Sequence, residues 1–126
     1  MARILVLDDV LDAGVLIKRI LQRKGHVVHV FDDEDEALRF TEKNSVDLAI
    51  LDMNLPKMDG LDVLCEMQKV LPHLSAIMLT GLPDADMAKQ AFAHGAVGYC
   101  AKPIDKDRLE EGVAKALLNR KDLSEQ

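Results

Sequence analysis

Aromatic residues are scarce in this sequence. It holds three phenylalanines, one tyrosine and no tryptophan, so aromatics make up only 3% of its 126 residues. Hydrophobic residues still account for 48%, which is enough for one domain to bury a core without disulfide or metal staples. The core is therefore expected to be built mainly from aliphatic side chains.

Cysteine is scarce as well, and long apolar runs are absent. Cys65 and Cys100 form no Cys-x-x-Cys pair, so two small buried thiols are expected rather than a disulfide or a metal site. Few cysteines suit a reducing compartment. The sequence opens without a signal-peptide layout, and no apolar run approaches the ~20 residues of a membrane span. These absences predict a cytoplasmic location and no membrane partner.

Positive charge is in the minority. Sixteen lysines and arginines stand against 22 aspartates and glutamates, and the formal net charge is -6. Binding to a nucleic-acid backbone requires clustered Lys and Arg. The sequence therefore predicts no direct nucleic-acid partner.

Five short apolar runs alternate with helical patterns along the chain. The runs are rich in Val, Ile and Leu and show little alternation, which is typical of parallel strands covered on both faces. The predicted strands span residues 3–7, 27–31, 48–51, 76–79 and 98–101. Apolar residues at helical spacing predict helices around residues 13–21, 35–42, 63–71, 84–94 and 109–117.

This alternation predicts an α/β fold. Right-handed crossovers between successive strands give an open parallel sheet with helices on both faces. The fourth predicted helix carries a small apolar set and is expected to be held loosely. One domain is expected over residues 1–120, and residues 121–126 are expected to be a polar tail or the start of a linker.

Polar residues stand where the predicted strands end. Asp8 and Asp9 follow the first strand, Asp52 follows the third, Thr80 follows the fourth and Lys102 follows the fifth. Ligands of open α/β sheets bind outside the carboxyl ends of the strands. These side chains are therefore expected to form one site.

The residue types of this site suit phosphoryl transfer. Three neighbouring carboxylates repel one another unless a cation lies between them, and carboxylate oxygens with waters suit Mg²⁺. A lysine and a threonine hydroxyl provide the cation and the hydrogen-bond donor that a phosphoryl group requires. An aspartate can itself be the nucleophile that forms an aspartyl-phosphate.

Four stretches of the sequence carry a family resemblance: residues 4–9, 48–60, 78–81 and 95–103. In these stretches the chain resembles the receiver domains of response regulators in bacterial two-component systems. The resemblance covers about residues 3–119, and residues 80–88 resemble receivers of the nitrogen-regulation type. It implies a flavodoxin-like (βα)5 fold with strand order 2-1-3-4-5.

The resemblance also implies roles for the site residues. Asp52 would be the phosphoacceptor, with Lys102 and Thr80 as its catalytic partners. Thr80 and Tyr99 would form the switch, and the peptide bond before Pro103 would be cis. The implied Mg²⁺ ligands are Asp8, Asp9, Asp52 and Asn54, and the implied phosphate-binding residues are Met53, Gly81 and Lys102.

The implied function is a phosphorylation-dependent signalling switch rather than an enzyme acting on a free substrate. Its expected partners are a histidine kinase or phosphotransfer protein on one side, and an output domain, an effector or a second copy of the chain on the other. Val10 and Leu82 depart from the family pattern beside the phosphoryl site, which bears on the lifetime of the phosphoryl group.

Other functions fit the sequence less well. An Asp-nucleophile phosphatase would carry an Asp-x-Asp pattern on the first strand, and a nucleotide or flavin carrier would need a loop rich in Gly and Ser there. A pseudo-receiver that binds partners without phosphorylation is the remaining alternative. The acidic run at residues 32–36 is expected to cap the second helix rather than bind metal.

Overall fold

Five strands alternate with five helices in the computed structural model, which describes residues 2–125 and the side chains as far as residue 118. Each predicted strand and helix is present, and the strands begin and end within two residues of the prediction. The strands are β1 (Arg3–Leu7), β2 (Val27–Phe31), β3 (Leu48–Asp52), β4 (Ser75–Thr80) and β5 (Ala96–Ala101). The helices are α1 (Leu11–Gln22), α2 (Glu34–Lys43), α3 (Gly60–Val70), α4 (Ala85–Ala93) and α5 (Lys106–Glu125).

The last helix is longer than predicted. Helix α5 continues to Glu125, so the expected boundary at residue 120 falls inside it. Whether residues 121–126 begin a linker stays a prediction, since their side chains lie outside the described residues. No helix within residues 2–125 combines the length and the hydropathy needed to cross a bilayer.

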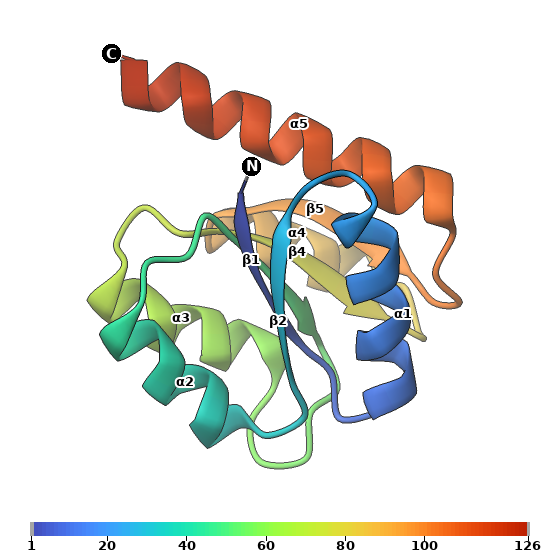
Figure 1. Ribbon diagram of the computed structural model, residues 1–126. Coiled ribbons are helices and arrows are strands. Elements are labelled where there is room, and N and C mark those ends of the chain that lie inside the picture. The colour runs from blue at the N-terminus through green and yellow to red at the C-terminus, as the bar shows by residue number, and fades with distance from the viewer. Residues whose placement is uncertain (1, 126) are drawn as a thin grey trace.

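The strands form one parallel sheet in the order β2-β1-β3-β4-β5, which confirms the predicted order. All the strands run in one direction, so their carboxyl ends meet at the lower edge of the sheet in Figure 1. The order reverses between β1 and β3. Residues that follow these two strands are therefore neighbours in space.

Two apolar layers cover the sheet, because successive side chains of a strand point to opposite faces. Leu5 and Leu7 of β1 pack with α2 and α3, while Ile4 and Val6 pack with α1 and α5. Figure 1 shows α2 and α3 on one side of the sheet and α1 on the other. The largest fully buried side chains are Ile, Leu and Met, which confirms the aliphatic core.

Aspartates stand before four of the helices, and the one before α5 is Asp105, which accepts a hydrogen bond from the Arg108 N–H at 3.0 Å. The Asp33 carboxylate accepts a hydrogen bond from the Glu36 N–H at 3.0 Å and caps α2, which confirms that the acidic run marks this helix start. Asp59 and Asp84 cap α3 and α4 in the same way.

Helix α4 is held by few buried side chains. Ala91 is its buried residue, whereas Met87 is half-buried and Phe92 is 51% exposed. This confirms the small apolar set that its sequence predicted. The two cysteines are free, as predicted, but they are half-buried rather than fully buried.

Candidate functional site

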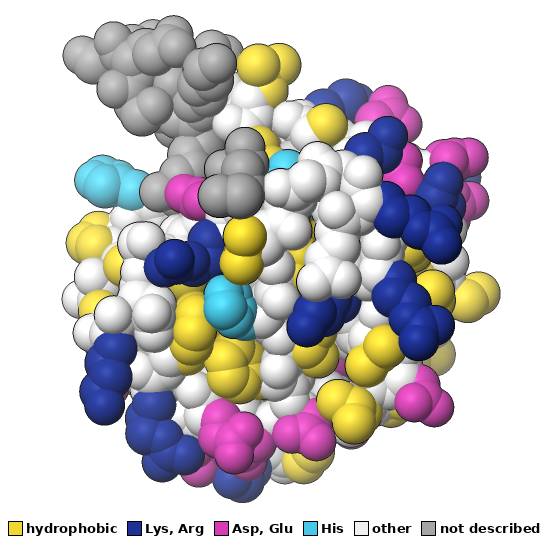
Figure 2. Space-filling model, viewed as in Figure 1, with side chains coloured by type: hydrophobic (Ala, Val, Ile, Leu, Met, Phe, Trp, Pro, Cys, Tyr) yellow, Lys and Arg dark blue, Asp and Glu magenta, His cyan; other side chains and the backbone are white. Residues whose placement is uncertain are grey.

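Three carboxylates meet at the carboxyl edge of the sheet. Asp8 and Asp9 directly follow β1, and Asp52 is the last residue of the neighbouring strand β3. Their side-chain oxygens lie within 4.8 Å of one another. Asp8 is fully buried, Asp52 is 3% exposed and Asp9 is exposed. The space-filling view shows acidic side chains gathered at this lower edge (Figure 2).

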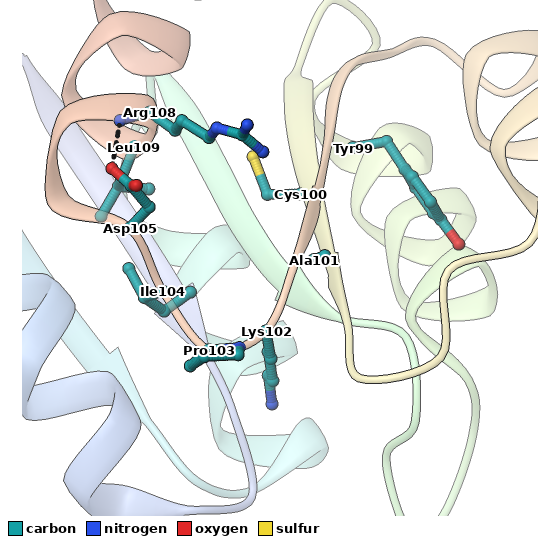
Figure 3. Close-up of a pocket in the computed structure, with 9 residues that line it drawn as sticks. All are labelled: Tyr99, Cys100, Ala101, Lys102, Pro103, Ile104, Asp105, Arg108 and Leu109. Atoms are coloured by element: carbon teal, nitrogen blue, oxygen red, sulfur yellow. Dashed lines mark hydrogen bonds between the residues drawn. The ribbon is translucent and has the colours of Figure 1, made fainter.

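Lys102 reaches the same cluster from the end of β5. Its ammonium nitrogen lies 2.8 Å from Asp8 Oδ2 and 3.1 Å from Asp52 Oδ2. Its backbone N–H donates to the Thr80 carbonyl oxygen at 2.7 Å, which fixes the chain where the strand ends. The bond to Pro103 is cis, as the resemblance implied. Figure 3 shows the lysine side chain directed away from the start of α5.

The two buried carboxylates keep Lys102 charged. Burial alone would lower the pKa of this lysine, but close contact with the Asp8 and Asp52 carboxylates and attraction to their charges outweigh it. The pKa of Lys102 is therefore raised above its ordinary value, and the ammonium persists at neutral pH.

One oxygen of Asp8 lacks a hydrogen bond. Asp8 Oδ1 accepts from the Val10 N–H at 2.9 Å, but the buried Oδ2 accepts none, since Lys102 approaches it as an ion pair outside a hydrogen-bonding direction. A buried acceptor without a donor is costly. Three carboxylates beside one ammonium also leave excess negative charge. The donor set and the unsatisfied oxygen both fit a hard divalent cation such as Mg²⁺.

Gly60 allows α3 to begin directly against Asp52. A Cβ atom at this position would collide with the Asp52 carbonyl oxygen and lie 2.9 Å from Met78 Cε. The Gly60 N–H donates to the Met53 carbonyl, and the Met53 N–H donates to Leu79 on β4. Gly60 lies in one of the stretches that carry the resemblance, but its role was not apparent from the sequence, because the close contact is formed only in the folded chain.

Of the other implied phosphate-binding and metal-binding residues, Met53 and Asn54 directly follow Asp52, and Gly81 follows β4. The Asn54 N–H donates to Asp52 Oδ1 at 3.0 Å. The Met53 side chain is buried in the core layer of α2 and α3, so only its backbone remains for a ligand. A Cβ atom at Gly81 would meet no atom within 4 Å, which leaves open space after β4.

Thr80 and Tyr99 occupy neighbouring strands. Thr80 is buried at the end of β4, and its hydroxyl oxygen accepts from the Leu82 N–H at 3.1 Å. The Tyr99 hydroxyl oxygen accepts from the N–H of Asp84, the cap of α4, at 3.4 Å. Tyr99 and Cys100 lie on opposite sides of β5 in Figure 3, and Tyr99 packs on the α2–α3 side.

A pocket of about 310 Å³ lies along β5 and the start of α5 (Figure 3). Its lining includes Cys100, Asp105 and Arg108, and burial raises the pKa of the Cys100 thiol. Lys102 also lines the pocket, but the three carboxylates do not. The carboxylates suited to phosphoryl chemistry therefore lie at the strand ends and not in this pocket.

Sequence reasoning missed one buried carboxylate, that of Glu34. It is 2% exposed and accepts a hydrogen bond from the Lys57 N–H at 2.6 Å. From the sequence, Glu34 was expected only to take part in capping the second helix. Nothing local distinguishes Glu34 from its acidic neighbours, since its direction is set by the loop that folds over it.

Comparisons with known proteins agree with the geometry. The sequence model of the family described as "Response regulator receiver domain" matches residues 4–114. The chain is 30% identical over 115 residues to Sporulation initiation phosphotransferase F of Bacillus subtilis (strain 168), covering 91% of this chain and 93% of that protein. It is 36% identical over 121 residues to Transcriptional regulatory protein GlrR of Escherichia coli (strain K12), covering 92% of this chain but only 26% of that protein.

Solved structures give the same result. A response regulator receiver domain protein from Clostridium thermocellum superimposes with a TM-score of 0.87 at 41% identity, covering 98% of both chains. NtrX from Brucella abortus, crystallised in complex with ATP, gives a TM-score of 0.92 at 34% identity, and the match covers 98% of this chain and 28% of that one.

Proposed function

This chain belongs to the family of response regulator receiver domains, and from that membership we propose that it is a signalling switch that accepts a phosphoryl group on Asp52. Receivers are typically non-enzymatic signalling modules, so the proposed chemistry is limited to the chain's own phosphorylation and dephosphorylation. The observation that carries the proposal is the contact of the Lys102 ammonium with the nearly buried Asp52 carboxylate, inside the cluster with Asp8 and Asp9.

In the proposed reaction an Asp52 oxygen attacks phosphorus and forms a new P–O bond. The bond to the donor, a phosphohistidine or a small acyl phosphate, breaks with its electron pair on the leaving group. Lys102 pairs with the phosphoryl oxygens, and the Thr80 hydroxyl donates to one of them. Met53 and Gly81 border the phosphoryl group through their backbone.

Magnesium has a defined place in this proposal. Asp8, Asp9 and Asp52 would hold it through carboxylate oxygens, Asp8 by way of a water, and Asn54 through its backbone carbonyl. When bound, Mg²⁺ supplies positive charge to the phosphoryl oxygens. The unsatisfied Asp8 oxygen and the excess of carboxylates support this assignment.

The proposed response runs from Thr80 to α4. A phosphoryl group on Asp52 would draw the Thr80 hydroxyl from the Leu82 N–H, and the space it leaves would admit Tyr99. Because the Tyr99 hydroxyl contacts the cap of the weakly held α4, its movement would shift α4, β5 and α5 together. This face is proposed to meet an output domain, an effector or a second copy of the chain.

The relatives support the signalling role at a coarser level. One is named a phosphotransferase and several are named transcriptional regulatory proteins. The chain spans about a quarter of the regulators' length, so their output activity is not transferred to it. A histidine kinase or phosphotransfer protein as phosphodonor is proposed, and the cytoplasmic location stays a prediction.

The experiment that tests the proposal is intact-protein mass spectrometry after incubation with acetyl phosphate, with and without Mg²⁺. We expect a gain of one phosphoryl group that requires Mg²⁺, is absent in Asp52→Ala and is retained in Asp12→Ala, a matched change of an exposed carboxylate on α1. No gain in the folded wild-type protein under either condition would contradict the proposal and favour a pseudo-receiver.

A further inference from the structure

The buried Glu34 carboxylate holds the middle of the loop between β3 and α3. From this contact we infer that Glu34 is a positioning residue for the Mg²⁺ and phosphoryl site, an inference that rests on the proposed function. Its oxygen Oε2 accepts from the Lys57 N–H at 2.6 Å and lies 3.4 Å from the Met58 N–H, which points at the same atom. Both contacts join residues more than twenty positions apart in sequence.

Three adjacent acidic residues at the start of α2, Asp33 to Asp35, all contact Lys57. Asp33 and Asp35 are more exposed and bind the Lys57 ammonium at 2.8 and 3.0 Å, while Glu34 between them points inward to the backbone. Figure 1 shows the start of α2 beside the loop that follows β3. The side chain and the backbone of Lys57 are thus held by the same helical turn.

The loop it holds carries the site. Residues 53–59 have no regular secondary structure, begin directly after Asp52 and include Asn54. Hydrogen bonds to Asp52 and Met53 fix the loop near its two ends. Glu34 fixes its middle, three residues beyond the carbonyl proposed to bind Mg²⁺.

The strength of the contact comes from its charge and its burial. A hydrogen bond from an amide to a carboxylate is about twice as strong as one between neutral groups. The N-terminal end of α2 also favours a negative charge at its first residue. A buried carboxylate would be unfavourable without these donors, so Glu34 and the loop conformation stabilise each other.

The test compares Glu34→Ala and Glu34→Gln with Glu36→Ala and Glu36→Gln, the matched changes at an exposed position of the same turn. Amide hydrogen exchange at Lys57 and Met58 reports the loop, and calorimetric titration with Mg²⁺ reports the site. We expect Glu34→Ala to speed exchange on the order of tenfold and to weaken Mg²⁺ binding several-fold. Glu34→Gln keeps a hydrogen-bond acceptor, so its exchange rate and its Mg²⁺ affinity should lie between those of Glu34→Ala and those of the wild type.

The Glu36 variants are expected to match the wild-type protein in both measurements. Faster exchange with unchanged Mg²⁺ affinity would overturn the inference, since Glu34 would then stabilise the fold without positioning the site. If Glu34→Ala does not fold, Glu34→Gln carries the test, and wild-type Mg²⁺ affinity in that variant would overturn the inference too.

The outcome is separable from that of the proposed function. A wild-type protein that binds Mg²⁺ but accepts no phosphoryl group would contradict the proposed function and leave this comparison intact. Absence of Mg²⁺ binding by the wild-type protein would overturn both.

Discussion

Lys102 balances part of a charge cluster that is otherwise unfavourable. It touches Asp8 and Asp52, both nearly or fully buried, while one Asp8 oxygen still lacks a hydrogen bond. Removing one partner from a buried ion pair leaves the other charge uncompensated, which is more costly than the pair itself. Without a bound cation, the stability of the site therefore depends strongly on the Lys102 side chain.

We predict that Lys102→Ala lowers the free energy of unfolding of the metal-free protein by roughly 2 kcal/mol. Complete burial would give about 3–5 kcal/mol, but the Lys102 side chain is 24% exposed, which weakens the effect. Saturating Mg²⁺ should restore much of the loss, because the dication takes over the neutralisation. Urea denaturation in chelator and in Mg²⁺ measures both values.

Lys69→Ala is the control, since Lys69 makes an exposed ion pair with Glu66 within α3 and should leave the midpoint unchanged. Equal stability of Lys102→Ala and wild type in chelator would contradict the prediction.

The difference in unfolding free energy between Lys102→Ala and the wild type should also become smaller at high pH. The pKa of Lys102 is raised above the ordinary 10.5, so its contribution is complete below that value and disappears as pH rises through the folded-state pKa.

The site residues differ in how far the sequence could predict them. Asp8, Asp52, Thr80 and Lys102 were predictable because each stands at the end of a predicted strand, and parallel strands bring their ends together. Glu34 was not, because its importance depends on which way one carboxylate of an acidic run turns after folding. Sequence periodicity does not contain that information.

Among the secondary-structure elements, the strands could also be predicted from the sequence. Burial on both faces requires continuous apolar runs, and these are visible in the sequence. Capping aspartates mark the starts of α2 to α5 in the sequence, whereas α1 begins after Val10, which provides no side-chain cap. The end of α5 was not marked, since the mostly polar sequence after Leu118 is compatible with an exposed helix and with a tail. Close contacts between elements, such as α3 against β3, also had no local signal.

Two glycine-to-alanine substitutions test the packing of α3 and α5. We predict that Gly60→Ala destabilises the protein by about 1–3 kcal/mol, because its methyl group would meet the rigid Asp52 carbonyl. We predict that Gly112→Ala, inside α5, stabilises it by roughly 0.5–1 kcal/mol, because its methyl group would meet only Ile77 Cδ1 at 3.7 Å and alanine favours a helix.

Thermal and urea denaturation of the two variants, each compared with the wild-type protein, measures the predicted loss and the predicted gain in stability. Gly60→Ala should also slow phosphorylation, since the carbonyl it displaces belongs to the phosphoacceptor residue. A neutral Gly60→Ala would show that α3 can shift without strain, and a destabilised Gly112→Ala would show that α5 packs more tightly on β4 than the 3.7 Å contact indicates.

The residues that stabilise the fold and those proposed to act in function lie in different parts of the molecule. Two aliphatic layers on the faces of the sheet hold the fold, while the carboxylates lie at one edge. The net charge of -6 and the local cluster act in the same direction, so folding concentrates negative charge where a cation is proposed to bind. A ligand that binds the native state alone then stabilises the entire domain through this edge.

We predict that Mg²⁺ raises the free energy of unfolding by about 2.7 kcal/mol at a free concentration one hundred times its dissociation constant. Urea denaturation at several Mg²⁺ concentrations measures the rise, and KCl at matched ionic strength is the control for screening of the net charge. Asp9→Asn should weaken the effect of Mg²⁺ with little change in KCl, because Asp9 is exposed and adds one carboxylate to the cluster. Equal stabilisation by Mg²⁺ and by KCl would mean that the dication only screens the acidic surface, and the three carboxylates would then not form a metal site.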